Sequence, residues 1–208
     1  MLGQPAPAYA DGLLVAGFGS GDIACLRAES GGVVWTDNLS SARGRTSIAD
    51  ISAIRGLPVI SGGRVFVMGV GGLTVGLDLR AGRRLWEREV GGGETPWLAG
   101  DWVFILTADQ QVAALNAGDG RIAWATDLPR WENEEKSKGA IYWTGPVLTG
   151  DRLIVACRGG EQEAFAISPY TGKILGRQSL PGNASLAPIV ADNKVFTLTD
   201  DATLMALG

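Results

Sequence analysis

The feature that most constrains this chain is an internal repeat, because a repeat of this length sets the whole architecture. Five units each open with a proline: Pro7, Pro58, Pro96, Pro146 and Pro188. In the first four units a polar turn residue is followed four positions later by a glycine: Gly31, Gly82, Gly120 and Gly172. Four positions beyond the glycine stand Trp35, Trp86, Trp124 and, in the fourth unit, Gly176. This agreement indicates one structural unit copied along the chain.

Each unit holds four short runs rich in Val, Ile, Leu, Phe or Trp, separated by turns that contain Gly or Asp. In the second unit the runs cover residues 57–61, 64–69, 73–79 and 83–89. Their length and composition are those of β-strands. No segment has a sustained 3.6-residue apolar period, so we expect almost no helix. Repeated four-stranded units of this size predict an all-β chain of the β-propeller class, with the repeated tryptophans serving in blade packing.

The repeat also predicts how the chain is divided. We expect four complete four-stranded blades and three strands of a fifth, about 19 strands, in a single partial propeller domain of residues 1–208. The expected blades cover approximately residues 7–37, 57–89, 94–126, 144–179 and 186–208. Such an arrangement is typical of part of a larger ring. Because an open ring leaves strand edges and apolar blade faces unpaired, it also predicts self-association.

Charge and composition exclude several classes of function. The net charge of −4 and the pI of about 4.9 argue against nucleic-acid binding, which needs clustered Lys and Arg. No apolar run is long enough for a membrane-spanning helix, and the first residues lack the basic start and apolar segment of a signal peptide. The chain has no histidine, the commonest general base. Cys25 and Cys157 stand in apolar runs, so we expect buried thiols without a disulfide.

Two of the links between units are long, and long loops on a rigid scaffold usually carry specific function. The first covers residues 38–56 and has isoleucines every three residues beside three arginines. It either packs its isoleucines on a blade edge or docks a protein through an apolar core with a charged rim. Under the docking hypothesis its candidate protein-binding residues are Ile51, Ser52, Ala53, Ile54 and Arg55.

The second long link covers residues 127–143. Its mixed charges predict a solvated loop. Trp131 within it is a further candidate protein-binding residue, because tryptophan is enriched at interaction hot spots. The alternative is that Trp131 caps the rim of its own blade.

The sequence offers no constellation of residues for catalysis or for holding a cofactor or metal. Acidic residues stand singly in turns: Asp11, Asp22, Asp101, Asp151 and Asp192. The Gly-rich stretches 17–21 and 69–72 lie between strands, without the following helix that a phosphate loop needs. No serine stands in a Gly-x-Ser-x-Gly elbow. We therefore expect no enzymatic activity, no cofactor and no metal site.

Residues 77–86 and 114–124 resemble the Ala-Leu-Asp-x-x-x-Gly-x-x-x-Trp repeat of PQQ-type propellers, which quinoprotein dehydrogenases share with non-catalytic propellers. The order of the links is more specific. A long link before Pro58, a short one before Pro96 and a longer one before Pro146 resemble the last five blades of the BamB family, over essentially the whole chain. The resemblance implies an eight-bladed ring without enzymatic activity.

The resemblance also implies a partner and a location. It implies binding to the periplasmic domains of BamA during assembly of outer-membrane β-barrel proteins. It places the protein at the periplasmic face of the outer membrane, held by a lipid anchor that this chain lacks. Family contacts involve the loop that ends here at Pro58, where Ala53 and Arg55 stand in place of two Asp residues of the family pattern. Two alternatives stay open: a fragment of a PQQ-dependent dehydrogenase, and a general interaction propeller with another partner.

Overall fold

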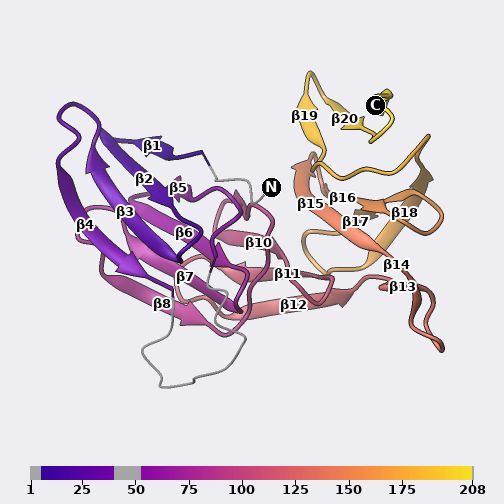
Figure 1. Cartoon of the computed structure of the whole chain (residues 1–208), viewed down its shortest axis with the longest axis horizontal. Helices are drawn as coiled ribbons and strands as arrows, with labels where there is room; N and C mark the ends of the chain where they lie inside the picture. The colour runs from indigo at the N-terminus through magenta and orange to yellow at the C-terminus, as the bar shows by residue number, and fades with distance from the viewer. Residues whose placement is uncertain (1–5, 40–52, 208) are drawn as a thin grey trace. The chain divides into compact units, whose positions relative to one another are not determined.

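The computed structural model describes residues 6–39 and 53–207. In this part of the chain every regular element is a β-strand and none is a helix, so the all-β prediction is confirmed (Figure 1). The strands form antiparallel sheets in which consecutive strands are neighbours. This meander follows from the sequence, because short links containing Gly or Asp join successive apolar runs.

The first two sheets have four strands each. One consists of β1 (Ala8–Ala10), β2 (Leu13–Gly17), β3 (Asp22–Arg27) and β4 (Val33–Asn38). The other consists of β5 (Val59–Ser61), β6 (Arg64–Gly69), β7 (Leu73–Asp78) and β8 (Arg84–Arg88). The four runs predicted in the second unit therefore match β5–β8 to within two residues at each end.

Three further sheets follow the same plan. The third consists of β9 (Trp97–Ala99), β10 (Trp102–Leu106), β11 (Gln111–Asn116) and β12 (Ile122–Asp127). The fourth consists of β15 (Tyr142–Thr149), β16 (Arg152–Arg158), β17 (Glu163–Ile167) and β18 (Ile174–Ser179). The last has three strands, β19 (Ile189–Ala191), β20 (Lys194–Leu198) and β21 (Leu204–Leu207).

The charge run of the second long link, residues 132–139, is exposed to solvent as predicted, but the link is more than an irregular loop. It contains a hairpin of β13 (Trp131–Asn133) and β14 (Lys138–Ala140). The Asn133 side chain accepts a hydrogen bond from the Lys136 N–H at 2.9 Å, which closes the turn. Ser137 takes a left-handed backbone with φ of 48°. Turn chemistry therefore makes a hairpin where the sequence shows no apolar alternation.

The chain divides into two compact units. One comprises Met1–Val103 with Asn116–Arg121, and the other comprises Phe104–Leu115 with Ile122–Gly208. The prediction that residues 1–208 form a single domain stays a prediction. In the first unit the core lies between the first two sheets, where both faces of β6 and β7 are buried. Strands that are covered on both sides explain why their sequences do not alternate between apolar and polar residues.

The repeated tryptophans, which the sequence assigns to blade packing, lie between successive sheets. Each indole N–H donates a hydrogen bond to a backbone carbonyl in the turn before the fourth strand of the next sheet. The pairs are Trp35 with Leu79 at 2.8 Å, Trp86 with Ala117 at 3.0 Å and Trp124 with Pro169 at 3.0 Å. Each tryptophan thus contributes both buried aromatic surface and a satisfied polar group to the packing of two sheets.

Candidate protein-interaction sites

The first candidate segment, Ala53–Arg55, lies against the ends of two sheets in the first unit. The Ile54 N–H donates to the Phe18 carbonyl at 3.1 Å, and the Val70 N–H donates to the Ala53 carbonyl at 2.9 Å. Phe18 follows β2 and Val70 follows β6, so the segment crosses from one sheet to the other. Its backbone is fixed by hydrogen bonds on both sides, which is what a surface presented to a partner requires.

Ile54 is a core residue. It is 1% exposed, and its Cγ2 atom lies 2.6 Å from the position that a Cβ on Gly17 would take. Ala53 is also buried. The packing alternative therefore describes Ile54, while Ile51 and Ser52 lie outside the described residues. The Ile54 side chain packs in the core beneath the segment. Among the described candidate residues of this link, Arg55 is the one that is exposed.

Arg55 is exposed, and no hydrogen bond or ion pair of its guanidinium occurs among the described residues. Its Cδ atom and the Cγ2 atom of Val70 lie 3.7 and 3.8 Å from the position of a Cβ on Gly93. Phe18 and Leu57 beside this segment are each 41% exposed. We call Phe18, Arg55, Leu57 and Val70 the Arg55 patch. It combines a guanidinium that has no partner among the described residues with the exposed Phe18 and Leu57 and the half-buried Val70.

Sequence reasoning missed Phe18 and Leu57. A signal for Phe18 was present, because an aromatic residue between glycines in a turn has no strand face to pack on. The backbone of Leu57 is held at this edge by Thr95, whose hydroxyl accepts a hydrogen bond from the Leu57 N–H at 2.9 Å. That contact joins distant parts of the sequence, so no local pattern indicates it.

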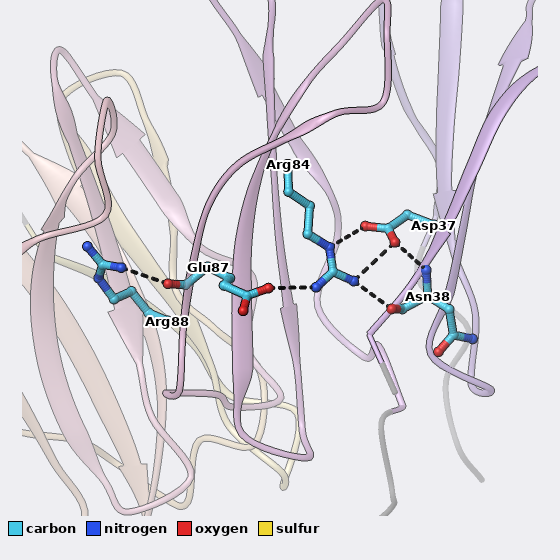
Figure 2. Close-up of polar contacts among 5 residues, drawn as sticks. All are labelled: Asp37, Asn38, Arg84, Glu87 and Arg88. Atoms are coloured by element: carbon cyan, nitrogen blue, oxygen red, sulfur yellow. Dashed lines mark hydrogen bonds and ion pairs between the residues drawn. The ribbon is translucent and has the colours of Figure 1, made fainter. Parts of the chain in front are cut away.

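A polar network fixes the strand that leads into the first long link. The Arg84 guanidinium on β8 donates to both carboxylate oxygens of Asp37, at 2.7 and 3.0 Å, and to the Asn38 carbonyl at 2.6 Å (Figure 2). Its remaining terminal nitrogen lies 2.9 Å from a carboxylate oxygen of Glu87. The hydrogen bonds to Asp37 are the main cause that raises the pKa of Arg84. Arg84 thus holds the end of β4 against β8.

Both described ends of this link meet the same turn. The Leu39 N–H donates to the Gly21 carbonyl at 2.9 Å, and Ile54 reaches Phe18 as described above. Both Leu39 and Ile54 are buried. The turn between β2 and β3 therefore anchors both described ends of the link. Arg84 restrains Asp37 and Asn38, which directly precede Leu39.

The second candidate, Trp131, is half-buried on the β13–β14 hairpin in the second unit. The carboxylate of Glu132 accepts the Gly160 N–H at 3.0 Å, and the Arg130 carbonyl accepts the Ile141 N–H at 2.9 Å. These contacts hold the hairpin on the fourth sheet. Half-burial leaves Trp131 available in part to a partner, and its role in binding stays a prediction.

The fourth sheet carries an exposed aromatic and cationic pair that the sequence did not indicate. Tyr142 is 50% exposed, and the guanidinium of Arg158 lies 5.1 Å from its ring centroid. The two residues are register partners on β15 and β16. Their contact depends on a register that pairs residues distant in the sequence, which explains why sequence reasoning missed it.

The described residues contain no group of three or more His, Cys, Asp or Glu side chains that could hold a metal ion. Both cysteines are buried and free, as predicted. Burial raises the pKa of the Cys25 and Cys157 thiols, so neither is a reactive thiolate at neutral pH. No helix in the described part of the chain is long and apolar enough to cross a membrane.

Comparison with known proteins identifies the family. The family described as outer membrane protein assembly factor BamB matches residues 1–126 and 126–208. The chain belongs to the BamB family. Two curated relatives are the BamB proteins of Salmonella typhimurium, 28% identical, and Escherichia coli K12, 27% identical; each match covers 100% of this chain and 50% of the relative. The chain thus spans about half the length of the relatives that it matches.

Solved structures confirm the β-propeller class. BamB from Moraxella catarrhalis has a TM-score of 0.82 at 22% identity, over 99% of this chain and 59% of that one. A quinohemoprotein alcohol dehydrogenase from Comamonas testosteroni has a TM-score of 0.75 at 14% identity, over 99% and 41% respectively. Likeness at this identity establishes the fold that BamB and the dehydrogenases share, and it leaves the chemistry to be argued from the residues.

Proposed function

We propose that this chain is a non-catalytic scaffold in outer-membrane protein assembly. Its family membership and the names of its relatives support a place in that process. In this proposal the sheets hold a binding surface, and no bond is made or broken. The protein acts in this proposal at the periplasmic face of the outer membrane.

The observation that carries the proposal is the Arg55 patch. Arg55 has no ion pair among the described residues, and exposed Phe18 and Leu57 flank it. An unpaired guanidinium beside apolar side chains is suited to an interface with an apolar core and a charged rim. The buried Ile54 and its backbone hydrogen bonds hold this surface in one conformation before binding, which lowers the entropic cost of association.

The partner that we propose is a BamA-like protein, bound through its periplasmic domains. The resemblance to the BamB family supports this choice, together with the position of Ala53 and Arg55 in the link that the family uses. The positive charge of Arg55 is complementary to an acidic site on the partner. Trp131 is proposed as a second, separate contact in the other unit.

A binding measurement with charge-reversed variants tests this proposal. The chain is immobilised, and the affinity of the periplasmic domains of the cognate BamA-like protein is measured. We expect Arg55→Glu to weaken binding by about tenfold, which corresponds to about 1.4 kcal/mol. The matched control is Arg80→Glu, an exposed arginine on the turn between β7 and β8, which should bind like the wild type. Absence of binding by the wild type, or equal loss in both variants, would contradict the proposal.

The likeness to quinohemoprotein alcohol dehydrogenase makes a cofactor-binding propeller the second candidate. A thermal-shift titration with PQQ and calcium separates the two. Because a ligand that binds the folded state raises the melting temperature with its concentration, a dehydrogenase fragment would show a saturable increase. We expect no such increase, and a clear one would overturn the scaffold proposal.

A further inference from the structure

The turn between β17 and β18 differs in chemistry from its three counterparts. The corresponding segments of the four-stranded sheets, each beginning at the polar turn residue, are 27–38, 78–89, 116–127 and 168–179. The third position of the first three segments holds Glu29, Arg80 and Gly118, and in the fourth segment it holds Tyr170. All four residues are exposed, and Tyr170 is 78% exposed. Because polar or small residues serve the same turn in three sheets, the fold does not require the tyrosine ring.

The residues that follow Tyr170 extend this exposed apolar surface. Ile174 is 38% exposed and Leu175 is 53% exposed. The register shift between β17 and β18 leaves Leu175 without a partner on β17. The equivalent Val34 and Leu85 of the first two sheets are half-buried. Three large apolar side chains are therefore exposed within residues 170–175.

The charges around these side chains are all positive. Segment 168–179 contains Lys173 and Arg177 and no acidic residue, whereas each of the other three segments contains at least two. Arg177 packs on the Phe165 ring, 4.5 Å from its centroid, and lies 3.8 Å from a carboxylate oxygen of Glu163. Lys173 is exposed, and its ammonium has no partner among the described residues. A chain with a net charge of −4 thus carries a local cationic site beside exposed apolar groups.

The turn that carries Tyr170 is held on both sides. The Trp124 indole N–H donates to the Pro169 carbonyl at 3.0 Å, and the Thr126 hydroxyl donates to the Gly172 carbonyl at 2.6 Å. The Gly172 N–H donates to the Ser168 carbonyl at 2.9 Å. The backbone beneath the exposed side chains is therefore ordered before any partner binds, which lowers the entropic cost of binding.

We propose that Tyr170, Lys173, Ile174 and Leu175, here called the Tyr170 patch, bind the surface of an anionic lipid bilayer. A tyrosine has an apolar ring and a polar hydroxyl, which suits the headgroup layer. Lys173 covers apolar surface with its aliphatic stem and places its ammonium among lipid phosphates. An exposed turn at the end of a sheet can enter a headgroup layer, which has no fixed shape, whereas a protein interface needs a complementary surface.

Cosedimentation of the chain with lipid vesicles tests this proposal. The vesicles contain phosphatidylcholine either alone or mixed with phosphatidylglycerol. We expect saturable binding to the anionic vesicles that weakens as salt is added, and little binding to phosphatidylcholine alone. Tyr170→Ser should lower the partition coefficient by about fivefold, because it removes the inserted ring. Lys173→Glu should lower it by about tenfold, because it reverses the charge that faces the phosphates.

Two matched variants control for the loss of a tyrosine and for the change of charge. Tyr9→Ser removes a tyrosine that is 65% exposed on β1, in the other unit. Arg83→Glu reverses an exposed charge at the position of the second sheet that corresponds to Lys173. Both controls should bind the vesicles like the wild type. Absence of wild-type binding to anionic vesicles, or an equal loss in the controls, would overturn the proposal.

Two other occupants of the patch are distinguished by further measurements on the same variants. Tyr170→Ser should bind the periplasmic domains of the BamA-like protein as the wild type does. Loss of that binding with unchanged vesicle binding would show that the patch docks a protein, and a homodimer that Tyr170→Ser dissociates would show that it docks a second copy. Either result would overturn the bilayer proposal. The Arg55 patch lies in the other unit, so each proposal can fail without the other.

Discussion

Two sheet interfaces of this molecule have the same strand plan and different contents. We call the interface between two neighbouring sheets a seam. The first seam, between β1–β4 and β5–β8, buries large side chains, among them Ile23, Trp35 and Leu77. The last seam, between β15–β18 and β19–β21, packs Ala156, Ala164, Leu180 and Ala184. Ile154 and Met205 pack against this cluster and are only partly buried. The described clusters at the two seams therefore differ in the size of the side chains that they bury.

The position of the repeated tryptophan accounts for much of this difference. Trp35 closes the first seam with its ring over Gly82 and its N–H on the Leu79 carbonyl. At the equivalent position of the fourth sheet stands Gly176, and no described atom lies within 4 Å of a Cβ built on it. The comparison teaches that the repeat specifies the sheets, while one residue in each unit determines how firmly a sheet holds its neighbour.

Removal of Trp35 should have the largest effect. Trp35→Ala deletes a buried ring and leaves the Leu79 carbonyl with one partner fewer, so we expect a loss of about 3–5 kcal/mol in the free energy of unfolding. Met205→Ala at the last seam should cost less than half as much, because Met205 is only partly buried. Calorimetric unfolding of both variants checks this order. Equal losses would show that the two seams do not differ in strength.

Removal of Arg84 should have the next largest effect, because its guanidinium joins β8 to β4 across the first seam (Figure 2). The Arg84 side chain is 28% exposed, and the Asp37 side chain on β4 is 22% exposed. Arg84→Ala leaves Asp37 and the Asn38 carbonyl without these donors, and we expect a loss of about 1–3 kcal/mol. Arg83→Ala, at an exposed neighbouring position, is the control for denaturant unfolding and should cost little. A loss no larger than that of the control would mean that the network adds nothing to the seam.

Substitution of two strand glycines should change stability in opposite directions. Gly176→Ala adds a methyl group in open space and removes chain entropy from the unfolded state, so we expect a gain of about 0.5–1 kcal/mol. Gly76→Ala would place its Cβ 2.5 Å from the Trp86 ring, so we expect a loss of about 1–3 kcal/mol. The melting temperature of each variant, compared with that of the wild type, shows whether its stability rises or falls. A loss for Gly176→Ala would indicate that something covers this position.

Acid should weaken the first sheet slightly. Hydrogen bonds from Ser20 and from Asn38 lower the pKa of Asp22 below its ordinary value of 3.8. A carboxylate with a lowered pKa stabilises the folded state above its unfolded pKa, and this contribution disappears as the pH falls through the folded value. Between pH 6 and pH 3 we expect the melting temperature of the wild type to fall further than that of Asp22→Asn. An equal loss in both proteins would exclude this contribution.

Much of the fold could be predicted from the sequence because its signals are local. Proline, turn glycine and tryptophan recur in register, and the predicted run 64–69 coincides with β6 (Arg64–Gly69). The β13–β14 hairpin could not be predicted in this way. Its strands are mainly polar and exposed, and its turn depends on the Asn133 side chain and on the left-handed backbone of Ser137.

The candidate site was predictable only in part. The spacing of the isoleucines left both packing and docking open, and the burial of Ile54 is decided by Gly17 and Phe18 in another sheet. Such contacts join residues far apart in the sequence. Arg55 was identified, and the structure adds its exposed neighbours Phe18 and Leu57. Whether Arg55 and Trp131 contact a partner remains a prediction, tested by the binding measurement above.

Native-state hydrogen exchange of the backbone amides tests the difference between the two seams most directly. It reports the opening free energy of each strand under conditions where the protein stays folded. We predict that the paired amides of β20 and β21 exchange through an opening of β19–β21 that leaves β2, β3, β6 and β7 protected. Protection in β20 and β21 equal to that in β6 and β7 would contradict the claim that the last seam is the weaker one.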